Sequence, residues 1–230
     1  MSTITVGGQL LVLLPERAAF LPESRTLLVA DAHIGKAVSF RKLGVPVPRG
    51  TTTETLTVLS ALVARLVALR IVFLGDFLHS THAHAPATMA AVERWRGRHA
   101  GVELTLVRGN HDDRAGDPPA HLGIDVVDEP LAFAGLALCH HPRPRADRYV
   151  LGGHLHPCTN ISGRAFDRLR LPCFWFGARV GVLPAFGAFT GMHPIRPAAG
   201  DRVFAVTDEH VAELRLAGAE VDAAALQARR

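Results

Sequence analysis

Apolar runs of five or six residues alternate with longer amphipathic segments in the first half of the chain. Three of these runs have the length of buried strands: TLLVA at 26–30, RIVFLG at 70–75 and VELTLV at 102–107. QLLVLL near the N-terminus has the same character. Residues 53–69 instead repeat leucine and valine at helical spacing, and PATMAAVERWRGRH begins with a proline suited to a first helical turn. The pattern predicts alternating strands and helices.

The second half of the chain consists mostly of strand-like segments. Examples are IDVVDE, LAFAGLALCHH, RYVLGGHLH, RLRLPCFWF, RVGVLPAF and RVFAVTD, whereas HVAELRLA at 210–217 has helical periodicity. Strand–helix alternation followed by strands predicts a layered α/β domain with a mixed sheet or two packed sheets. A length of 230 residues without a linker-like segment suits one domain, residues 1–230.

Composition excludes several classes of protein. A hydrophobic fraction of 48% argues for a globular chain, and no apolar run approaches the roughly 18 residues of a membrane span. The N-terminus lacks the features of a secretory signal, and three cysteines without C-x-x-C spacing indicate free thiols, so we expect a cytoplasmic protein. The net charge is +4, and only Lys36 and Lys42 among the 25 lysines and arginines are lysine. We attribute this bias to genome composition rather than to a partner.

Polar residues of three types gather where five of the predicted strands end. They are Asp31 and His33, Asp76 and His79, Asn110, His111 and Asp112, His140 and His141, and His154 and His156. Ligands of open α/β sheets bind at the carboxyl ends of the strands, where the loops converge. One histidine alone is more often structural than functional. Five loops that carry aspartate, asparagine and histidine at the same place indicate a metal site.

The residue types narrow the choice of metal. Imidazole together with carboxylate and amide oxygens suits Mn, Fe, Zn or Co, whereas calcium and magnesium prefer oxygen ligands and structural zinc sites contain thiolates. Seven or eight ligands exceed what one ion needs. They suit two ions about 3.5–4 Å apart that share a carboxylate, an arrangement that hydrolyses phosphate esters.

Five motifs in chain order resemble the signature of the calcineurin-like metallophosphoesterases: DAH, GDFLH, GNHD, CHH and GGHLH, which span residues 31–156. The wording of DAHIGKA, CHHPRP and GGHLHP is similar to that of the bacterial DNA ligase-associated (PdeM-like) phosphoesterases. The resemblance implies an α/β (α+β) fold of two packed mixed β-sheets flanked by helices. It also implies two divalent metal ions, with Mn²⁺ as the first choice and Fe, Zn or Co as alternatives.

The resemblance implies a role for each motif residue. Seven residues would hold the metal ions: Asp31, His33 and His156 the first, Asn110, His140 and His154 the second, and Asp76 both. The catalytic roles would fall to His111, as a proton donor to the leaving oxygen or a clamp on the phosphate, and to Asp112, which would orient His111. His79 stands where many relatives carry an acid and where double-strand-break repair nucleases also have histidine. It would face the phosphate.

Two assignments stay open in the sequence. Relatives commonly read His-Gly where this chain reads His140-His141, and we take His140 as the ligand with His141 as the alternative. Arg143 and Arg145 follow this motif and are candidate contacts to a substrate phosphate backbone. Solvated loop charge is an equal alternative for both arginines.

Three functions fit these observations. The leading hypothesis is a dimetal phosphodiesterase, an endonuclease acting on DNA during repair, and the resemblance implies an ATP-dependent DNA ligase, a helicase and an exonuclease-like protein as associated partners. The alternative is a phosphodiesterase for small substrates such as cyclic nucleotides, because 230 residues leave little room for a separate DNA-capture domain. The third is a non-catalytic scaffold, which the complete set of expected ligands argues against.

Overall fold

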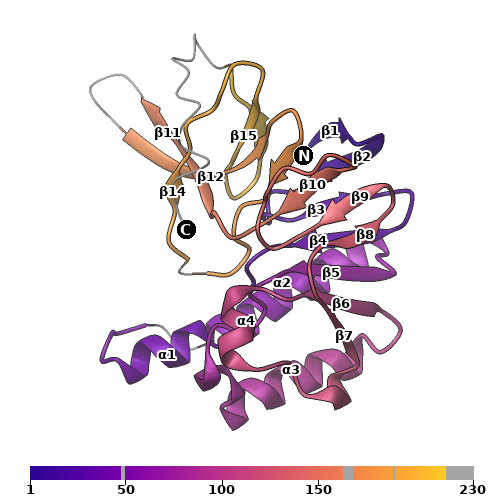
Figure 1. The fold of residues 1–230 in the computed structure, drawn as a ribbon. Helices are drawn as coiled ribbons and strands as arrows, with labels where there is room; N and C mark the ends of the chain where they lie inside the picture. Colours follow the sequence, from indigo (N-terminus) through magenta and orange to yellow (C-terminus); the bar gives the residue numbers. More distant parts are fainter. Residues whose placement is uncertain (48–49, 163–167, 189, 216–230) are drawn as a thin grey trace.

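Two β-sheets pack face to face in the computed structural model, which describes residues 1–47, 50–162, 168–188 and 190–215. The longer helices cover the outer face of the first sheet (Figure 1). Both sheets contain parallel and antiparallel strand pairs. The predicted layered α/β fold with two packed mixed sheets is therefore confirmed.

The first sheet has seven strands in chain order. They are β1 (Ser2–Val6), β2 (Gln9–Leu13), β3 (Ala19–Leu21), β4 (Thr26–Val29), β5 (Arg70–Leu74), β6 (Glu103–Val107) and β7 (Ile124–Val127). Strands β4 to β7 are parallel, since helical crossovers connect them. The helices are α1 (Lys36–Lys42), α2 (Thr51–Leu66), α3 (Pro86–Arg98) and α4 (Asn110–Ala115), with 3₁₀ turns η1 (Thr81–His84) and η2 (Ala120–Leu122).

The second sheet has the order β14-β11-β12-β13-β10-β9-β8, with β15 pairing to β12 and β16 to β15. Its strands are β8 (Leu131–Phe133), β9 (Leu136–Leu138), β10 (Tyr149–Gly152), β11 (Pro157–Ser162), β12 (Arg168–Phe176), β13 (Val180–Val182), β14 (His193–Pro194), β15 (Arg202–Val206) and β16 (Val211–Glu213). Strands β9, β10 and β13 are parallel, and the remaining pairs include antiparallel hairpins.

The helical interpretation of residues 210–217 is wrong within the described residues. This segment contains β16, which pairs antiparallel with β15 and places Val211 opposite Val206. The hydroxyl of Ser2 also donates a hydrogen bond of 2.7 Å to the carbonyl of Val211. Pairing across the sheet thus overrides a weak local periodicity. Residues 216 and 217 lie outside the described residues.

Two hydrophobic cores fill the spaces between the layers. One lies between the helices and the first sheet and includes Leu59 of α2, Trp95 of α3 and Phe73 of β5. The other lies between the two sheets and includes Leu74 of β5 and Phe174 of β12. The central strands of the first sheet are buried on both faces, which explains why their sequences are continuously apolar rather than alternating.

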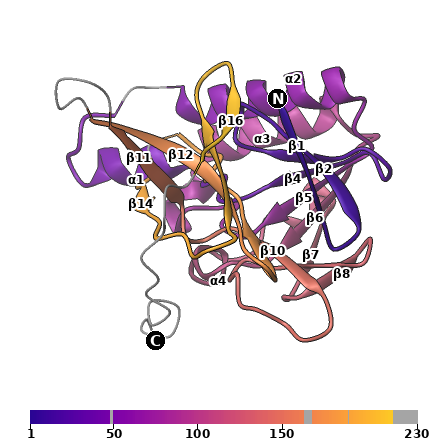
Figure 2. The ribbon, with the colours of Figure 1, turned by 90° about the horizontal axis from the view of Figure 1, so that it is seen from above.

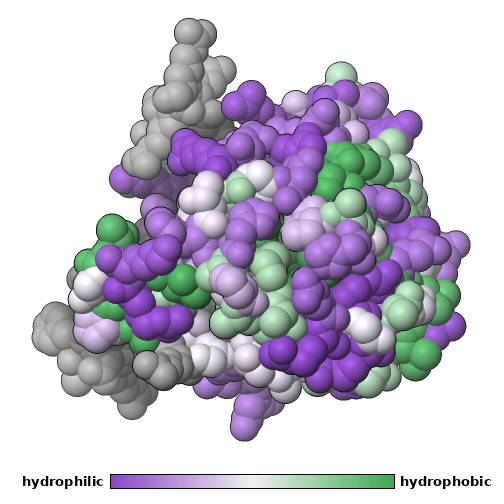
Figure 3. Space-filling model, turned by 90° about the horizontal axis from the view of Figure 1, so that it is seen from below, coloured by the Kyte–Doolittle hydropathy of each residue, from purple (hydrophilic) through white to green (hydrophobic). Residues whose placement is uncertain are grey.

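One side of the molecule carries both α1 and the strands β11, β12 and β14, as the two ribbon views agree (Figures 1 and 2). Seen from below, the surface is mostly hydrophilic, with an apolar group toward the side where α1 lies (Figure 3). Leu43 and Val45 directly follow α1 and are 78% and 44% exposed. Among the described residues, the helices are all too short or too polar to span a bilayer.

Candidate metal centre

The backbone of the metal loops is strained. Nine non-glycine residues of the described chain have a positive φ, and five of them are predicted ligands: Asp31 (52°), His33 (47°), Asp76 (51°), His154 (65°) and His156 (44°). Residues with a Cβ rarely adopt this left-handed conformation, which costs about 1–3 kcal/mol each unless the surroundings impose it. Strain concentrated on these residues favours a functional site over ordinary turns.

Asp31, His33 and His156, here called the first ligand set, converge after β4 and β10. The Nε2 atom of His156 lies 3.5 Å from Oδ1 of Asp31 and 3.4 Å from Nε2 of His33. Oδ2 of Asp31 accepts the backbone N–H of His154 at 2.9 Å, whereas Oδ1 is buried and has no hydrogen-bond partner. The carbonyl of Gly191 lies 3.1 Å from Nδ1 of His156, which leaves Nε2 free to bind a metal ion.

Asn110, His140 and His154, the second ligand set, converge on the other side of Asp76. The Nε2 atom of His140 lies 3.0 Å from Oδ1 of Asn110 and 3.0 Å from Nδ1 of His154. Nδ1 of His140 is 3.1 Å from the carbonyl of Leu74, to which it can donate its proton. This tautomer leaves a lone pair on Nε2, pointed at two other acceptor atoms.

Asp76 lies between the two sets. Its Oδ2 atom is 4.0 Å from Nε2 of His33, and its Oδ1 atom is 3.4 Å from Nε2 of His140. Oδ1 also accepts the backbone N–H of His111 at 2.9 Å, which fixes the carboxylate. One oxygen therefore faces each set, as a carboxylate that bridges two ions requires.

The charge states of these groups fit divalent metal ions. Burial lowers the pKa of His33 strongly, with the charge of Lys36 adding to it, and burial lowers the pKa of His154 to about 4. Neutral imidazole is the form that binds metals. The bare oxygen of Asp31 is an acceptor without a partner, and the facing ring nitrogens of the two sets can act as acceptors when the neutral imidazoles carry their protons on the other nitrogen. Divalent cations would satisfy these lone pairs together, so the residues present fit divalent metal binding.

Two glycines allow the ligands to approach this closely. A Cβ on Gly75, which has a φ of 78°, would collide with the ring of His140. A Cβ on Gly153 would lie 2.5 Å from Oδ2 of Asp31. The Gly-Asp and Gly-Gly-His motifs thus contain glycine because a ligand side chain from a neighbouring loop packs directly against the backbone at these positions.

His111 and His79 form one wall of the centre. Their rings stack at 4.8 Å with an interplanar angle of 21°, and the ring of Phe40 stacks on the far side of the wall, 6.2 Å from His79. Nδ1 of His111 lies 2.7 Å from the carbonyl of His79, which directs Nε2 to within 3.9 Å of Oδ2 of Asp76. The His111 side chain is 30% exposed, so a substrate can reach it.

Asp112 does not orient His111 in the way the sequence predicted. Its two oxygens accept the backbone N–H groups of Leu78 at 2.9 Å and Gly109 at 3.0 Å. Burial raises its pKa to about 6, and these hydrogen bonds oppose the rise. The carboxylate therefore caps the first turn of helix α4 and connects it to the loop after β5. The carbonyl of His79, rather than Asp112, orients the His111 ring.

Sequence reasoning missed Glu129, which follows β7. Its Oε2 accepts the backbone N–H groups of both His140 and His141 at 2.8 Å, and its Oε1 lies 2.9 Å from Nδ1 of His141. The His141 ring packs against His154 with centroids 4.5 Å apart. His140 thus points into the second ligand set, and His141 pairs with Glu129 beside it. No motif marked this glutamate, because its role depends on which strand lies next to β9.

The two candidate substrate contacts lie on the surface. Arg143 and Arg145 are exposed in the connection between β9 and β10. Nε of Arg145 lies 3.3 Å from Oδ1 of Asp147, a surface pair of small energetic value that a phosphate can displace. Their part in substrate binding stays a prediction.

Comparison with known proteins identifies the family. No protein-family model and no curated protein matches the chain. Among solved structures, the crystal structure of the Pseudomonas putida nuclease MPE matches with a TM-score of 0.82 and 46% identity, over 93% of this chain and 99% of that one. YfcE, a phosphoesterase from E. coli, matches with a TM-score of 0.42 and 16% identity, over 82% of this chain and 97% of that one. On the identity and coverage of the first match, together with its own five motifs, the protein belongs to the metallophosphoesterase family.

Proposed function

We propose that the protein is a dimetal phosphodiesterase that cleaves DNA. The observation that carries the proposal is the position of Asp76, whose two oxygens face two separate ligand sets. Two metal ions sharing a carboxylate suit the hydrolysis of phosphate esters. The nuclease title of the P. putida relative supports DNA or another nucleic acid as the substrate class. Manganese is the metal we propose first, with Fe, Zn and Co as alternatives that suit the same donors.

The protein's own residues would divide the work. The first ligand set would hold one ion, the second ligand set the other, and Asp76 both. When bound, the ions would supply Lewis acidity that polarises the phosphoryl group and acidifies water. His111 would hold a proton on Nε2, directed by the carbonyl of His79, and donate it to the leaving oxygen. His79 would present a second imidazole to the phosphate.

The outer contacts and the biological setting belong to the same proposal. Arg143 and Arg145 would contact the DNA backbone, since they are exposed and follow the loop that carries His140. The motif resemblance supports a role in cytoplasmic DNA repair beside an ATP-dependent DNA ligase, a helicase and an exonuclease-like protein.

Hydrolysis by metal-free protein reloaded with Mn²⁺ tests the proposal. Bis(p-nitrophenyl) phosphate, p-nitrophenyl phosphate and a labelled single-stranded DNA oligonucleotide are offered in parallel, with the Asp76→Asn variant as the control. We expect cleavage of the diester and of the DNA by the natural protein and of neither by the control. Diester cleavage with intact DNA would favour the small-substrate phosphodiesterase instead. Two bound metal ions without any cleavage would favour the scaffold.

A further inference from the structure

Lys36 is the first residue of α1 and follows directly on the loop that carries Asp31 and His33. The helix is anchored on both sides of the lysine. Gly35, with a φ of 81°, packs so closely that a Cβ there would lie 2.6 Å from Ala83, and the hydroxyls of Ser39 and Ser80 are 2.7 Å apart. The start of α1 is therefore held against the loop after β5, and the backbone of Lys36 has a defined place.

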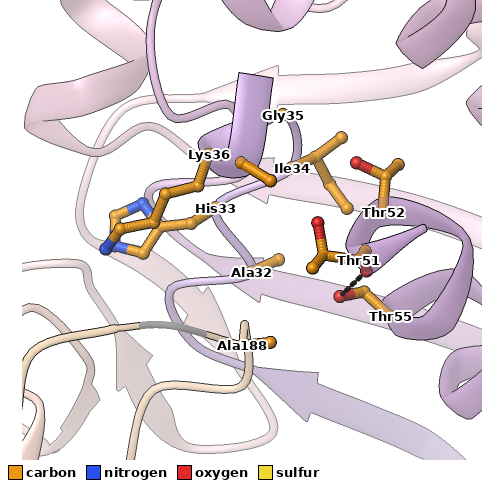
Figure 4. A pocket seen from close by; sticks show the side chains of 10 residues that line it. Ala32, His33, Ile34, Gly35, Lys36, Thr51, Thr52, Thr55 and Ala188 are labelled. Carbon is orange, nitrogen blue, oxygen red and sulfur yellow. Dashed lines mark hydrogen bonds between the residues drawn. The ribbon is translucent and has the colours of Figure 1, made fainter. Parts of the chain in front are cut away.

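The side chain of Lys36 extends toward the metal centre. Figure 4 shows it running in the same direction as that of His33, away from Thr51 and Thr55 at the start of α2. Lys36 is half-buried, and its ammonium lies over the ring of Phe40, 5.8 Å from the centroid. Phe40 in turn stacks on His79. The lysine is thus placed at the edge of the wall that His79 and His111 form.

The charge of Lys36 acts on the site without being paired. It contributes to the lowered pKa of His33 and of His79, after burial, and Asp31 and Asp76 are the carboxylates that counter the effect of burial on the lysine itself. Yet the side-chain ammonium of Lys36 forms no ion pair or hydrogen bond with the part of the chain that the structure describes. The contact with the Phe40 ring offsets only part of the cost of half-burying an ammonium that has no ion pair or hydrogen bond, so its place needs another explanation.

Metal binding would raise the energetic cost of leaving the Lys36 ammonium without an ion pair. The two carboxylates that attract Lys36 are the same ones that would hold divalent cations, which would neutralise and exceed their negative charge. The ammonium would then face a net positive centre and would be repelled by it. A phosphate group bound between the cations and the lysine removes this repulsion. A compact ammonium on a flexible stem suits such a contact.

We propose that Lys36 binds a phosphate oxygen of the substrate at the first ligand set. The inference rests on the proposed function only in requiring a phosphate ester as substrate, and it does not depend on DNA. It also gives a reason for lysine at this position in a chain whose other basic residues, apart from the exposed Lys42, are arginine. A guanidinium is a larger, planar group that would not take the place of the compact ammonium over the Phe40 ring in the same way.

Calorimetric titration of the manganese-loaded protein with inorganic phosphate tests the assignment. Lys36→Met should weaken phosphate binding about 10- to 100-fold, the effect of losing a hydrogen bond to a charged group. Lys36→Arg should retain part of the affinity, because the charge remains. Lys42→Met, which removes the exposed lysine of the same helix, should stay within about twofold of the natural protein. Manganese content and the melting temperature are measured for every variant.

The outcomes separate this proposal from the proposed function. Equal phosphate affinity in the natural protein and in Lys36→Met, including no binding by either, would overturn it. Loss of manganese from Lys36→Met would overturn it as well, because the lysine would then support the metal centre rather than the substrate. If Lys36→Met does not fold, Lys36→Gln takes its place. If phosphate binding depends on Lys36 but the protein leaves DNA intact, the role of Lys36 in phosphate binding is supported and only DNA is rejected as the substrate.

Discussion

Two histidine clusters face each other across Asp76, and they are held in different ways. The first cluster, His33, His79 and His111, comes from loops of the first sheet. The second cluster, His140, His141 and His154, comes from loops of the second sheet. The ligand atoms within each cluster lie within 4.8 Å of one another. A cation, Lys36, lies beside the first cluster, and a carboxylate, Glu129, lies beside the second.

The difference indicates a division of labour. A carboxylate next to imidazoles fixes their orientation and strengthens them as ligands, so the second cluster suits metal retention. A cation next to imidazoles weakens their attraction for metal ions and attracts anions, so the edge of the first cluster suits the substrate. The stacked and partly exposed rings of His79 and His111 agree with this interpretation. Mutation of His111 in the first cluster and of Glu129 beside the second should therefore separate chemistry from metal binding, whereas His33 of the first cluster is itself a proposed ligand.

The largest effect should come from Asp76→Asn, because Asp76 serves both clusters. Loss of an outer partner of a ligand costs about 10- to 100-fold in metal affinity, so loss of the shared carboxylate should cost more than about 100-fold and abolish turnover. Metal content after dialysis and hydrolysis of bis(p-nitrophenyl) phosphate measure the two consequences. Asp113→Asn, an exposed aspartate on α4, is the matched control. Two retained manganese ions in Asp76→Asn would contradict the bridging role.

His111→Ala should slow turnover without removing the metal ions, because His111 faces the substrate. The ring touches Asp76 only at 3.9 Å and is not part of either ligand set, so we expect full metal content with turnover slowed about 10²- to 10⁴-fold. Metal analysis and kcat measured on the same preparation test the two parts separately. His121→Ala, at an exposed histidine paired with Glu93, should change neither quantity. If His111→Ala lost its metal ions, His111 would belong with the ligands.

Sequence reasoning located most of this site because the fold makes its geometry simple. The carboxyl ends of neighbouring parallel strands meet at one edge, so polar residues at those ends, such as Asp31 and Asp76, are neighbours in space whatever lies between them in sequence. The strands of the first sheet were also predictable, since burial on both faces leaves a continuous apolar run. These features depend on local pattern alone.

The features that sequence reasoning missed depend on packing between segments. Glu129 precedes β8, and His140 and His141 follow β9. The antiparallel pairing of β8 with β9 brings Glu129 beside the two histidines, and the residues next to Glu129 in sequence do not indicate this contact. Asp112 was assigned to His111 by proximity in sequence, whereas its carboxylate closes the first turn of α4 and reaches Leu78. The segment around Val211 became a strand because β15 was available to pair with it.

Glu129→Ala should weaken the second cluster and leave the first intact. Without the carboxylate, the N–H groups of His140 and His141 lose their acceptor and the loop can turn His140 away from Asn110. We expect one of the two ions to bind about 10- to 100-fold more weakly, as outer-partner mutations commonly show. A manganese titration that resolves two sites measures this.

Glu129→Gln sharpens the same test. The amide oxygen can still accept the two N–H groups, although it cannot pair with His141 as a carboxylate does. We therefore expect an affinity between that of Glu129→Ala and the natural protein. Equal weakening of both metal sites in Glu129→Ala would mean that the two clusters do not behave independently.

The smallest effect should appear in the stability of the metal-free protein as the pH falls. His79 and His154 have pKa values of about 4 in the fold, chiefly because of burial, against about 6.5 when unfolded. Between pH 6.5 and 4 the unfolded state therefore binds more protons, and the stability that these histidines provide at neutral pH is lost. Asp112 acts in the opposite direction, because its pKa of about 6 lies above the unfolded value and the fold takes up its proton.

Burial also lowers the pKa values of His33 and His99 and raises that of Asp76. The four histidines with lowered pKa values outnumber the two aspartates with raised ones and should set the sign. We expect the melting temperature of metal-free protein to fall between pH 7 and 5, by roughly 2–4 °C for each kcal/mol lost. Manganese, which binds the neutral imidazoles, should raise the melting temperature most at pH 7. His79→Asn removes one depressed histidine and should flatten the dependence, whereas exposed His121→Asn should leave it alone. A melting temperature that rises on acidification would mean that the buried carboxylates, not the two histidine clusters, dominate the electrostatics of the empty site.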